Sequence, residues 1–312
     1  HGGGVLHDAA GSGKYYWYGE NKDGPTYHPD PRAPARVDVI GVSVYESEDL
    51  YNWEYKGLAL PADKEDEKSD LHPSRVVERP KVIHNEQTGK YVMYMHIDDA
   101  KYKEAKQGVA VSDSPLGPFT YLGSFRPNGQ ESRDFTLFKD DDGSAYVVYS
   151  SEDNFVTHIS RLTEDYLQTT GEYVRKFINE RREAPAVFKH GSKYLIVTSG
   201  CSGWAPNPAE VYVATDMLGH WESLGNPVVG DAAGKATTFR AQSAFVLPLQ
   251  GQPGKYIFMA DRWTPTDLQQ SRYVWLPLSV VDPRTDGLRL PDGDQSVLAT
   301  VSIRWRDAWK WA

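Results

Sequence analysis

The sequence predicts an all-β protein that folds as a single five-bladed β-propeller over residues 1–312. One motif recurs five times: a leading residue, an apolar pair four positions later, a glycine-containing turn, and a strand that opens with tyrosine. Most copies are followed by a second hairpin with alternating apolar residues and a closing aromatic residue. Two hairpins make four strands, and five such units at intervals of about 50 to 75 residues are typical of propeller blades.

The elements follow this repeat along the chain. In the fourth copy, EAPAVF and KYLIV are typical of strands, and Gly191 in the intervening KHGS suits a hairpin turn. The closing segment SVLATVSIRWRDAWKWA is strand-like and is a candidate to complete the ring, and no convincing amphipathic helix is present. The tyrosines that open the second strand of each copy are Tyr15, Tyr91, Tyr146, Tyr194 and Tyr256. The approximate blades are residues 1–77, 78–133, 134–182, 183–241 and 242–312.

The composition excludes several classes of function. A net charge of −9 and an isoelectric point of about 5.5 leave no basic surface for a phosphate backbone, so we expect no nucleic-acid partner. No apolar run is long enough to span a bilayer, and we expect no membrane partner. The single cysteine, Cys201, excludes an internal disulfide and every multi-cysteine zinc site. The sequence does not fix the oligomeric state; a monomer is favoured.

The leading residues of the copies are the candidate catalytic groups. The innermost strand of each blade runs along the central channel, so the first residue of every copy should lie at the same height around one funnel. This shared position in the repeat brings together Glu78, Asp134, Glu183, Gln242 and the region of His1. Converging carboxylates suit glycoside hydrolysis, in which one protonated acid donates to the leaving oxygen and a second group assists the attacking water.

Glu183 is the predicted general acid. Its immediate context, EAPAVF, is the most apolar of the three acids, and burial beside a second negative charge raises the pKa of a carboxyl group. Asp134 is then the charge that keeps Glu183 protonated. The alternative is that each acid pairs with the arginine beside it in the sequence, since ion-paired surface carboxylates are common. Three acids at one repeat phase favour the catalytic interpretation. The neighbouring arginines are Arg79, Arg133 and Arg182.

Several irregular segments carry candidate sugar-binding side chains. The Gly-, Ser- and Pro-rich excursion SGCSGWAPNPA offers Trp204 as an aromatic platform and Asn207 as an amide beside it. HIDDAKYKEA offers Tyr102, YGENKDG offers Glu20, and MADRWTP offers Trp263. For Trp204, packing over the blade is the open alternative.

We predict no required cofactor and no metal ligands. The acidic turn KDDDGS resembles a calcium loop but lacks the alternate-residue ligand spacing and the closing glutamate. A structural calcium ion therefore has no motif to support it, and a solvated hairpin turn explains the segment.

Two of these strands resemble glycoside hydrolase family 43. REAPAVFKHGSKYLIVTSG looks like the strand that carries the general acid of that family, and SRDFTLFKDDDGSAYVVYSS looks like the strand of its pKa-modulating aspartate. The resemblance covers essentially the whole chain. It implies a five-bladed propeller with inverting chemistry, in which Glu183 is the acid and Asp134 the modulator.

The first copy departs from the family pattern. An Asp-Pro at the start of blade one usually supplies the general base, and alignment of the apolar pair on Val5 and Leu6 puts Gly2 at that position. The set HGGGVL, VVERPKVIHN, SRDFTLFKDDDG, REAPA and FRAQSAFVLP is similar to the exo-β-1,3-galactanase branch, whose members lack that aspartate. The resemblance implies that Gln242 activates water through its imidic-acid tautomer. Residue chemistry alone favours Glu78 as the base, because a carboxylate accepts a proton far more readily than an amide.

The resemblance thus implies an inverting, exo-acting hydrolase that releases galactose from the non-reducing end of β-1,3-galactan, the backbone of arabinogalactan-proteins. Its partner is then a polysaccharide or oligosaccharide, and its expected location is secreted or periplasmic. One alternative is another activity of the family, on α-L-arabinofuranosides, β-D-galactofuranosides or β-xylosides. Another is a non-catalytic carbohydrate-binding propeller, which the missing aspartate favours.

Overall fold

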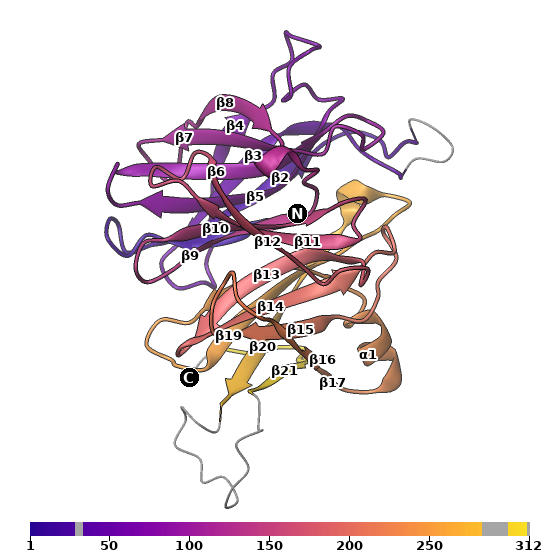
Figure 1. Ribbon diagram of the computed structural model, residues 1–312. Helices are drawn as coiled ribbons and strands as arrows, with labels where there is room; N and C mark the ends of the chain where they lie inside the picture. The colour runs from indigo at the N-terminus through magenta and orange to yellow at the C-terminus, as the bar shows by residue number, and fades with distance from the viewer. Residues whose placement is uncertain (29–33, 283–298, 311–312) are drawn as a thin grey trace, which may run out of the picture.

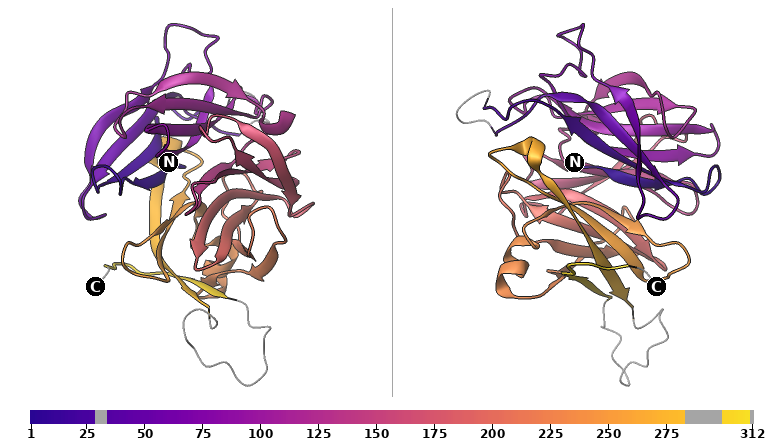
Figure 2. Two further views of the ribbon diagram at one scale, coloured as in Figure 1. Left: turned by 60° about the vertical axis from the view of Figure 1, so that its left-hand side comes forward. Right: turned by 180° about the vertical axis from the view of Figure 1, so that it is seen from behind.

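The computed structural model describes residues 1–28, 34–282 and 299–310, and it is a five-bladed β-propeller (Figure 1). This confirms the predicted fold. Four blades are four-stranded antiparallel sheets, and the fifth sheet has five strands. The blades surround one axis, with the first blade in indigo beside the last in yellow (Figure 2).

Each blade is built from strands that follow one another along the chain. The first two blades contain β1 (Gly4–His7), β2 (Tyr15–Lys22), β3 (Val39–Ser47), β4 (Glu54–Pro61), β5 (Val76–Asn85), β6 (Lys90–Asp98), β7 (Lys106–Ser112) and β8 (Thr120–Phe125). The next two contain β9 (Phe135–Lys139), β10 (Ala145–Ser151), β11 (Val156–Leu162), β12 (Thr169–Lys176), β13 (Arg182–His190), β14 (Lys193–Gly200), β15 (Glu210–Ala214) and β16 (Glu222–Gly225). The fifth contains β18 (Gln242–Pro248), β19 (Lys255–Arg262), β20 (Arg272–Val281), β21 (Thr300–Arg304) and β17 (Val228–Val229).

The repeated tyrosines join neighbouring blades. The Tyr91 hydroxyl of blade two donates to Asp8 Oδ1 of blade one at 2.9 Å. In the same way Tyr194 of blade four donates to Asp140 of blade three. The Tyr256 hydroxyl of blade five donates to the carbonyl oxygen of a blade-four residue at 2.9 Å. A phenol provides apolar surface for the core between two sheets and a hydroxyl that still finds a partner when buried, which is why tyrosine recurs at this position.

Two short strands from distant parts of the sequence complete the fifth blade. Strand β17 falls in the range predicted for blade four, yet it joins the sheet of blade five, where Val228 pairs with Ile303 in parallel. Strand β21, from the closing segment, pairs antiparallel with β20. The end of blade four is therefore tied to the outer edge of blade five.

Helices are few among the described residues. The α-helix α1 (Ala232–Thr237) is capped by Asp231, whose side chain accepts from Gly234 N at 2.7 Å. Six residues are too few to produce the amphipathic pattern that sequence analysis detects. Two single-turn 3₁₀ helices, η1 (Pro127–Gly129) and η2 (Leu268–Gln270), lie in loops. None of the described helices is long and apolar enough to cross a membrane.

Candidate active site

A cavity of about 340 Å³ lies where the innermost strands begin. The leading residues of four copies line it, namely Glu78, Asp134, Glu183 and Gln242. Four further predicted residues line the same cavity: Glu20, Tyr102, Trp204 and Trp263. His1, which leads the first copy, lies outside it and lines a neighbouring cavity. Its ring stacks on Tyr273 with centroids 4.9 Å apart.

Bulges at the start of the inner strands turn the leading side chains into the cavity. The pairing register shifts between Glu78 and Lys81 in β5, and between Glu183 and Ala186 in β13. Within each bulge one non-glycine residue has a positive φ, 54° at Arg79 and 52° at Ala184. Bulges re-aim side chains beside active sites, and a positive φ at such residues is a strained conformation that the surrounding structure must hold.

Glu183 is partly buried in the wall of the cavity. Its Oε1 accepts from Gln242 Nε2 at 2.9 Å, and Asn154 Nδ2 lies 3.5 Å from its Oε2. Burial, together with the charge of Asp134, raises the pKa of Glu183 to about 8, against a smaller opposing effect of Arg79. The carboxyl group is therefore protonated at neutral pH, as a proton donor must be.

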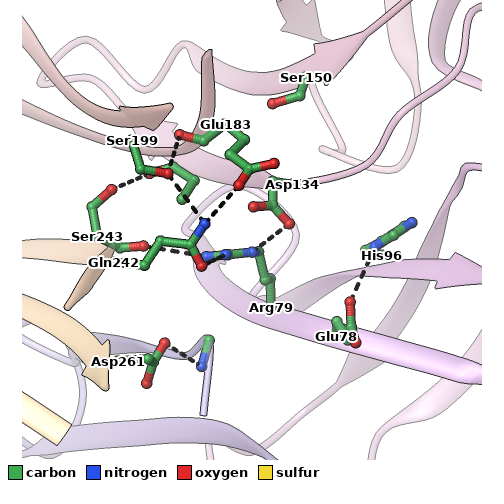
Figure 3. A network of polar contacts seen from close by, with 12 residues as sticks. Glu78, Arg79, His96, Asp134, Ser150, Glu183, Ser199, Gln242, Ser243 and Asp261 are labelled. Carbon is green, nitrogen blue, oxygen red and sulfur yellow. Dashed lines mark hydrogen bonds and ion pairs between the residues drawn. The ribbon is translucent and has the colours of Figure 1, made fainter. Parts of the chain in front are cut away.

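Arg79 organises the acid pair (Figure 3). Its Nε lies 2.6 Å from Asp134 Oδ1, while Nη2 donates to Gln242 Oε1 at 2.9 Å and Nη1 donates to the carbonyl oxygen of Ser243 at 3.3 Å. The Arg79 side chain is 6% exposed. Sequence reasoning considered Arg79 only in the alternative in which it pairs with Glu78, and it did not foresee the contacts of Arg79 with Asp134 and Gln242.

The other two arginines also bond elsewhere. Arg133 pairs with Glu131 at 2.8 Å, and Arg182 pairs with Glu210. None of the three acids forms an ion pair with the arginine beside it in the sequence, so that alternative is wrong in its pairing. The acids of the cavity are held by residues from other strands.

Gln242 makes four hydrogen bonds. Its Oε1 accepts from Arg79 Nη2 at 2.9 Å and from Trp263 Nε1 at 2.9 Å. Its Nε2 donates to Glu183 Oε1 at 2.9 Å and to Ser199 Oγ at 3.1 Å. The amide thus links the acid to the guanidinium and to one wall of the cavity.

Glu78 belongs to a separate network of charged side chains. Its Oε1 accepts from the Tyr102 hydroxyl at 2.9 Å and lies 3.4 Å from Lys22 Nζ, and its Oε2 lies 3.6 Å from His96 Nδ1. His96 Nε2 bonds Asp98 Oδ2 at 3.0 Å. Burial opposes ionisation, yet Lys22 and His96 hold the pKa of Glu78 well below its usual range.

His96 is cationic in this network of charged side chains. Although burial lowers its pKa, hydrogen bonds and charges from Asp98 and Glu78 raise it to about 9. Glu78 is therefore ionised at every pH in the working range of an enzyme. Lys22 and His96 were missed by sequence reasoning, because their spacing along the strands matches no motif.

The family can be assigned once this geometry is known. The profile of the glycosyl hydrolases family 43 matches residues 9–261. The chain belongs to glycosyl hydrolase family 43. This confirms the family that the sequence resembles. A search of curated proteins found no match to this family 43 chain.

Several solved structures similar to this family 43 chain are named β-1,3-galactosidase or exo-β-1,3-galactanase. A family 43 β-1,3-galactosidase, solved with galactodeoxynojirimycin, is 38% identical with a TM-score of 0.84, over 100% of this chain and 95% of its own. The exo-β-1,3-galactanase of Phanerochaete chrysosporium, solved with β-1,3-galactotriose, is 37% identical with a TM-score of 0.77, over 92% of this chain and 61% of its own. The exo-β-1,3-galactanase of Clostridium thermocellum is also 37% identical, with a TM-score of 0.77, over 89% of this chain and 59% of its own. This chain thus spans about 60% of the latter two.

Gly2, which the sequence alignment puts at the position of the usual family 43 aspartate, has little room for a side chain. A Cβ at Gly2 would lie 2.8 Å from Glu20 Oε1 and 3.1 Å from Arg79 Cα, and Gly2 has a φ of +62°. Glu20 is itself held by Lys22, with Nζ 2.9 Å from Oε2. The packing and the backbone conformation at Gly2 therefore disfavour an aspartate at this position.

Two indoles form one wall of the family 43 cavity. The rings of Trp204 and Trp263 meet edge to face with centroids 4.8 Å apart, and Trp204 Nε1 donates to the carbonyl oxygen of Ala35 at 3.1 Å. Asn207 is not among the lining residues. Its amide accepts from Gly200 N at 2.8 Å and donates to Gly200 O and Ser202 Oγ at 2.6 Å each. Asn207 thus closes the loop that presents Trp204; its sugar contact stays a prediction.

The described residues 1–28, 34–282 and 299–310 contain no group of three His, Cys, Asp or Glu side chains that would hold a metal ion. Cys201 lines the cavity, and its thiol donates to the carbonyl oxygen of Arg181 at 3.2 Å. Burial and the nearby Glu183 raise the pKa of this thiol, so it stays protonated and is a poor nucleophile.

Proposed function

We propose that this chain is an inverting exo-β-1,3-galactanase that releases galactose from the non-reducing end of β-1,3-galactan. The observation that carries the proposal is the cavity that Glu183 shares with Asp134 and Gln242, where burial and the charge of Asp134 raise the pKa of Glu183 to about 8. The names of the similar structures support galactan as the substrate.

In this proposal the reaction is a single displacement. Glu183 gives its carboxyl proton to the glycosidic oxygen while the bond from that oxygen to the anomeric carbon breaks. Water attacks the anomeric carbon from the opposite face and gives up one proton, for which Gln242 and Glu78 are the candidate acceptors. Asp134 contributes the negative charge that keeps Glu183 protonated before each turnover.

The dimensions of the cavity support exo action. Its volume is near the lower end of the range of about 300 to 1,000 Å³ that ligand pockets span. The indole wall of Trp204 and Trp263 bounds one side, which suits a chain end better than the middle of a polymer. We also propose a secreted or periplasmic location, where a polysaccharide substrate is accessible. All proposed catalytic groups come from one chain, so a monomer is sufficient.

Proton NMR of the enzyme mixed with β-1,3-galactan tests the proposal. We expect α-galactose to be the first product, before mutarotation, because inversion at a β-linked anomeric carbon gives the α anomer. β-Galactose as the first product would contradict inversion, and released oligosaccharides would contradict exo action. Binding of galactan oligosaccharides without any release would favour the non-catalytic alternative. Arabinan, xylan and β-galactofuranosides serve as substrate controls.

The pH profile tests the role of Asp134. We expect kcat/KM to fall above pH about 8, because ionised Glu183 cannot donate a proton. Asp134→Asn removes a charge that raises the pKa of Glu183 and leaves Arg79, which lowers it. The alkaline limb should therefore move to lower pH. Asp142→Asn, in the hairpin turn of the same blade, is the matched control, and an alkaline limb that is unmoved in Asp134→Asn would contradict the modulator role.

A further inference from the structure

A second cavity lies beside the active site, between the first and last blades, which are neighbours in the ring (Figure 2). Its volume is about 400 Å³. Glu20 lines both cavities. Lys22 lines the second cavity, where its Nζ lies 2.9 Å from Glu20 Oε2 and 3.4 Å from Glu78 Oε1 of the active site. The two cavities therefore share a wall of charged side chains.

Aromatic rings form a continuous row of contacts from the active site to the second cavity. Trp263, in the wall of the active site, has its ring centroid 5.4 Å from that of His1, which stacks on Tyr273 at 4.9 Å. Tyr273 meets Trp17 edge to face at 4.8 Å, and Trp17 lies 5.2 Å from Tyr45. Tyr273 is 45% exposed, so a ligand can reach its ring.

A groove of about 370 Å³ continues outward from the second cavity. Trp17 and Tyr273 line both. The indole of Trp275 meets that of Trp17 edge to face at 5.0 Å and adds a further ring to the groove. We call the second cavity and this groove together the seam site. Neither part is lined by Glu183, Asp134 or Gln242, so the seam site is separate from the acid that would cleave the substrate.

Three amides give the seam site its hydrogen-bonding groups. Asn21 uses its Nδ2 to donate to a serine hydroxyl at 2.8 Å, and Gln269 uses its Nε2 to donate to Asp23 Oδ1 at 2.9 Å. Gln270 uses its Oε1 to accept from Arg272 Nη2 at 2.9 Å. Each amide uses one end in these bonds, which leaves two acceptor ends and one donor end for a ligand.

A pyranose matches this combination of groups. β-Galactose has one face of C–H groups, which can stack on aromatic rings, and a rim of hydroxyl groups that both donate and accept hydrogen bonds. Binding sites for small ligands combine aromatic walls with a few convergent polar groups in the same way. The amides beside the rings favour a polyhydroxylated ligand over a purely apolar one.

We propose that the seam site is a second, non-catalytic carbohydrate-binding site, and that it holds a galactan segment other than the one in the active site. The choice of galactan rests on the proposed function, whereas the choice of a carbohydrate rests on the rings and amides of the seam site. A polysaccharide held there keeps the enzyme near further chain ends of the same material, which raises their effective concentration at the active site.

Indole NMR of Glu183→Gln labelled with ¹⁵N-tryptophan tests binding without turnover. On addition of β-1,3-galactotriose we expect the Trp204 signal of the active site to shift with one midpoint. The Trp17 and Trp275 signals of the seam site should shift with another, each signal being assigned by replacing that tryptophan with Phe. Tyr273→Ala should weaken binding at the seam site by about tenfold, as expected for the loss of one aromatic stacking partner.

The two sets of signals separate this inference from the proposed function. Shifts of Trp204 alone would overturn the seam site and leave the galactanase proposal standing. Shifts of Trp17 and Trp275 alone would support the seam site and count against galactan as the ligand of the active site.

Tyr173→Ala is the matched control. Tyr173 is 37% exposed and stacks on His158 with centroids 5.4 Å apart, much as Tyr273 stacks on His1, but it lies in blade three. This variant should leave both sets of shifts unchanged. Gln270→Ala removes an exposed amide and leaves the rings in place, so it should weaken binding at the seam site alone.

Hydrolysis gives a second readout. We expect Tyr273→Ala to raise KM for polymeric β-1,3-galactan several-fold with kcat unchanged, and to leave both constants unchanged for β-1,3-galactobiose, which is too short to provide a second segment. An equal loss on both substrates would place the effect of Tyr273 in the active site and overturn the proposal. Wild-type dimers in sedimentation that Tyr273→Ala dissociates would also overturn it, because the groove would then be an interface between copies of the chain.

Discussion

Replacing Glu183 with Gln is expected to lower kcat on β-1,3-galactan by about 10³- to 10⁴-fold, the upper part of the range that general acid catalysis contributes. The glycosidic oxygen of galactan is a poor leaving group, and an amide cannot protonate it. Because Glu183 is neutral at pH 7, an isosteric neutral amide introduces no new buried charge, and the fold should be retained.

Leaving-group dependence separates loss of the acid from general damage to the site. The dinitrophenolate of a dinitrophenyl β-galactoside can depart without being protonated. On this substrate, Glu183→Gln should therefore be nearly as active as the wild type. Glu222→Gln, at an exposed position of β16, is the matched control and should leave both rates unchanged. Near-normal turnover of galactan by Glu183→Gln would remove Glu183 from the acid role.

The same substitution should change stability in one pH range only. The folded-state pKa of Glu183 is raised above its usual value, so wild-type stability from this group is full below the unfolded-state pKa of about 4.3 and is lost progressively as pH rises from there to about 8. Gln cannot ionise. The melting temperature of Glu183→Gln, relative to the wild type, should therefore increase from about pH 4.3 to about pH 8 and level off above pH 8.

The repeat made the fold predictable because each copy contains the strand patterns of a blade and the residues that join it to the next blade. The tyrosines that define the copies are the residues that hydrogen-bond across blade boundaries, as with Tyr91 and Asp8. Where an element has no repeat, prediction failed. Strand β17 has two residues and pairs with a strand far along the chain, and α1 has six residues, so neither leaves a periodic pattern.

The sequence predicted which residues line the cavity, but it did not predict which of them bond to one another. The common phase of the copies places Asp134, Glu183 and Gln242 in one cavity, because propeller symmetry repeats the height of each inner strand. Their partners depend on where bulges turn the side chains. The bulges require positive φ at Arg79 and Ala184, and neither residue type signals that conformation in a sequence. The link from Arg79 to Asp134 was therefore invisible, and so was the loop closure by Asn207.

Arg79 is the residue whose loss should disturb both stability and catalysis most broadly. Arg79→Met leaves Asp134 as a partly buried carboxylate without its cation, for which a cost of about 3–5 kcal/mol in unfolding free energy is typical. It also removes one of the two donors that orient Gln242. Loss of one preorganised donor costs about 10²- to 10³-fold in kcat, and we expect a decrease of this size. Chemical denaturation and galactan hydrolysis measure the two effects.

The pH profile of Arg79→Met should move in the direction opposite to that of Asp134→Asn. The guanidinium lowers the pKa of Glu183 and Asp134 raises it, so removal of Arg79 should shift the alkaline limb to higher pH. A purely structural lesion would lower the rate without such a shift. Arg161→Met, at an exposed position of blade three, is the control and should affect neither quantity.

Two further variants separate charge from geometry. Arg79→Lys supplies a point charge that can pair with Asp134, but a lysine cannot also reach Gln242 and Ser243 through a planar fork. It should recover much of the stability and little of the rate. The double variant Arg79→Met with Asp134→Asn removes both charges, so its unfolding free energy should exceed that of Arg79→Met alone. If the double variant is instead less stable by the sum of the two single losses, then Arg79 and Asp134 are not energetically coupled, and the arginine stabilises the site through Gln242 and the β18 backbone alone.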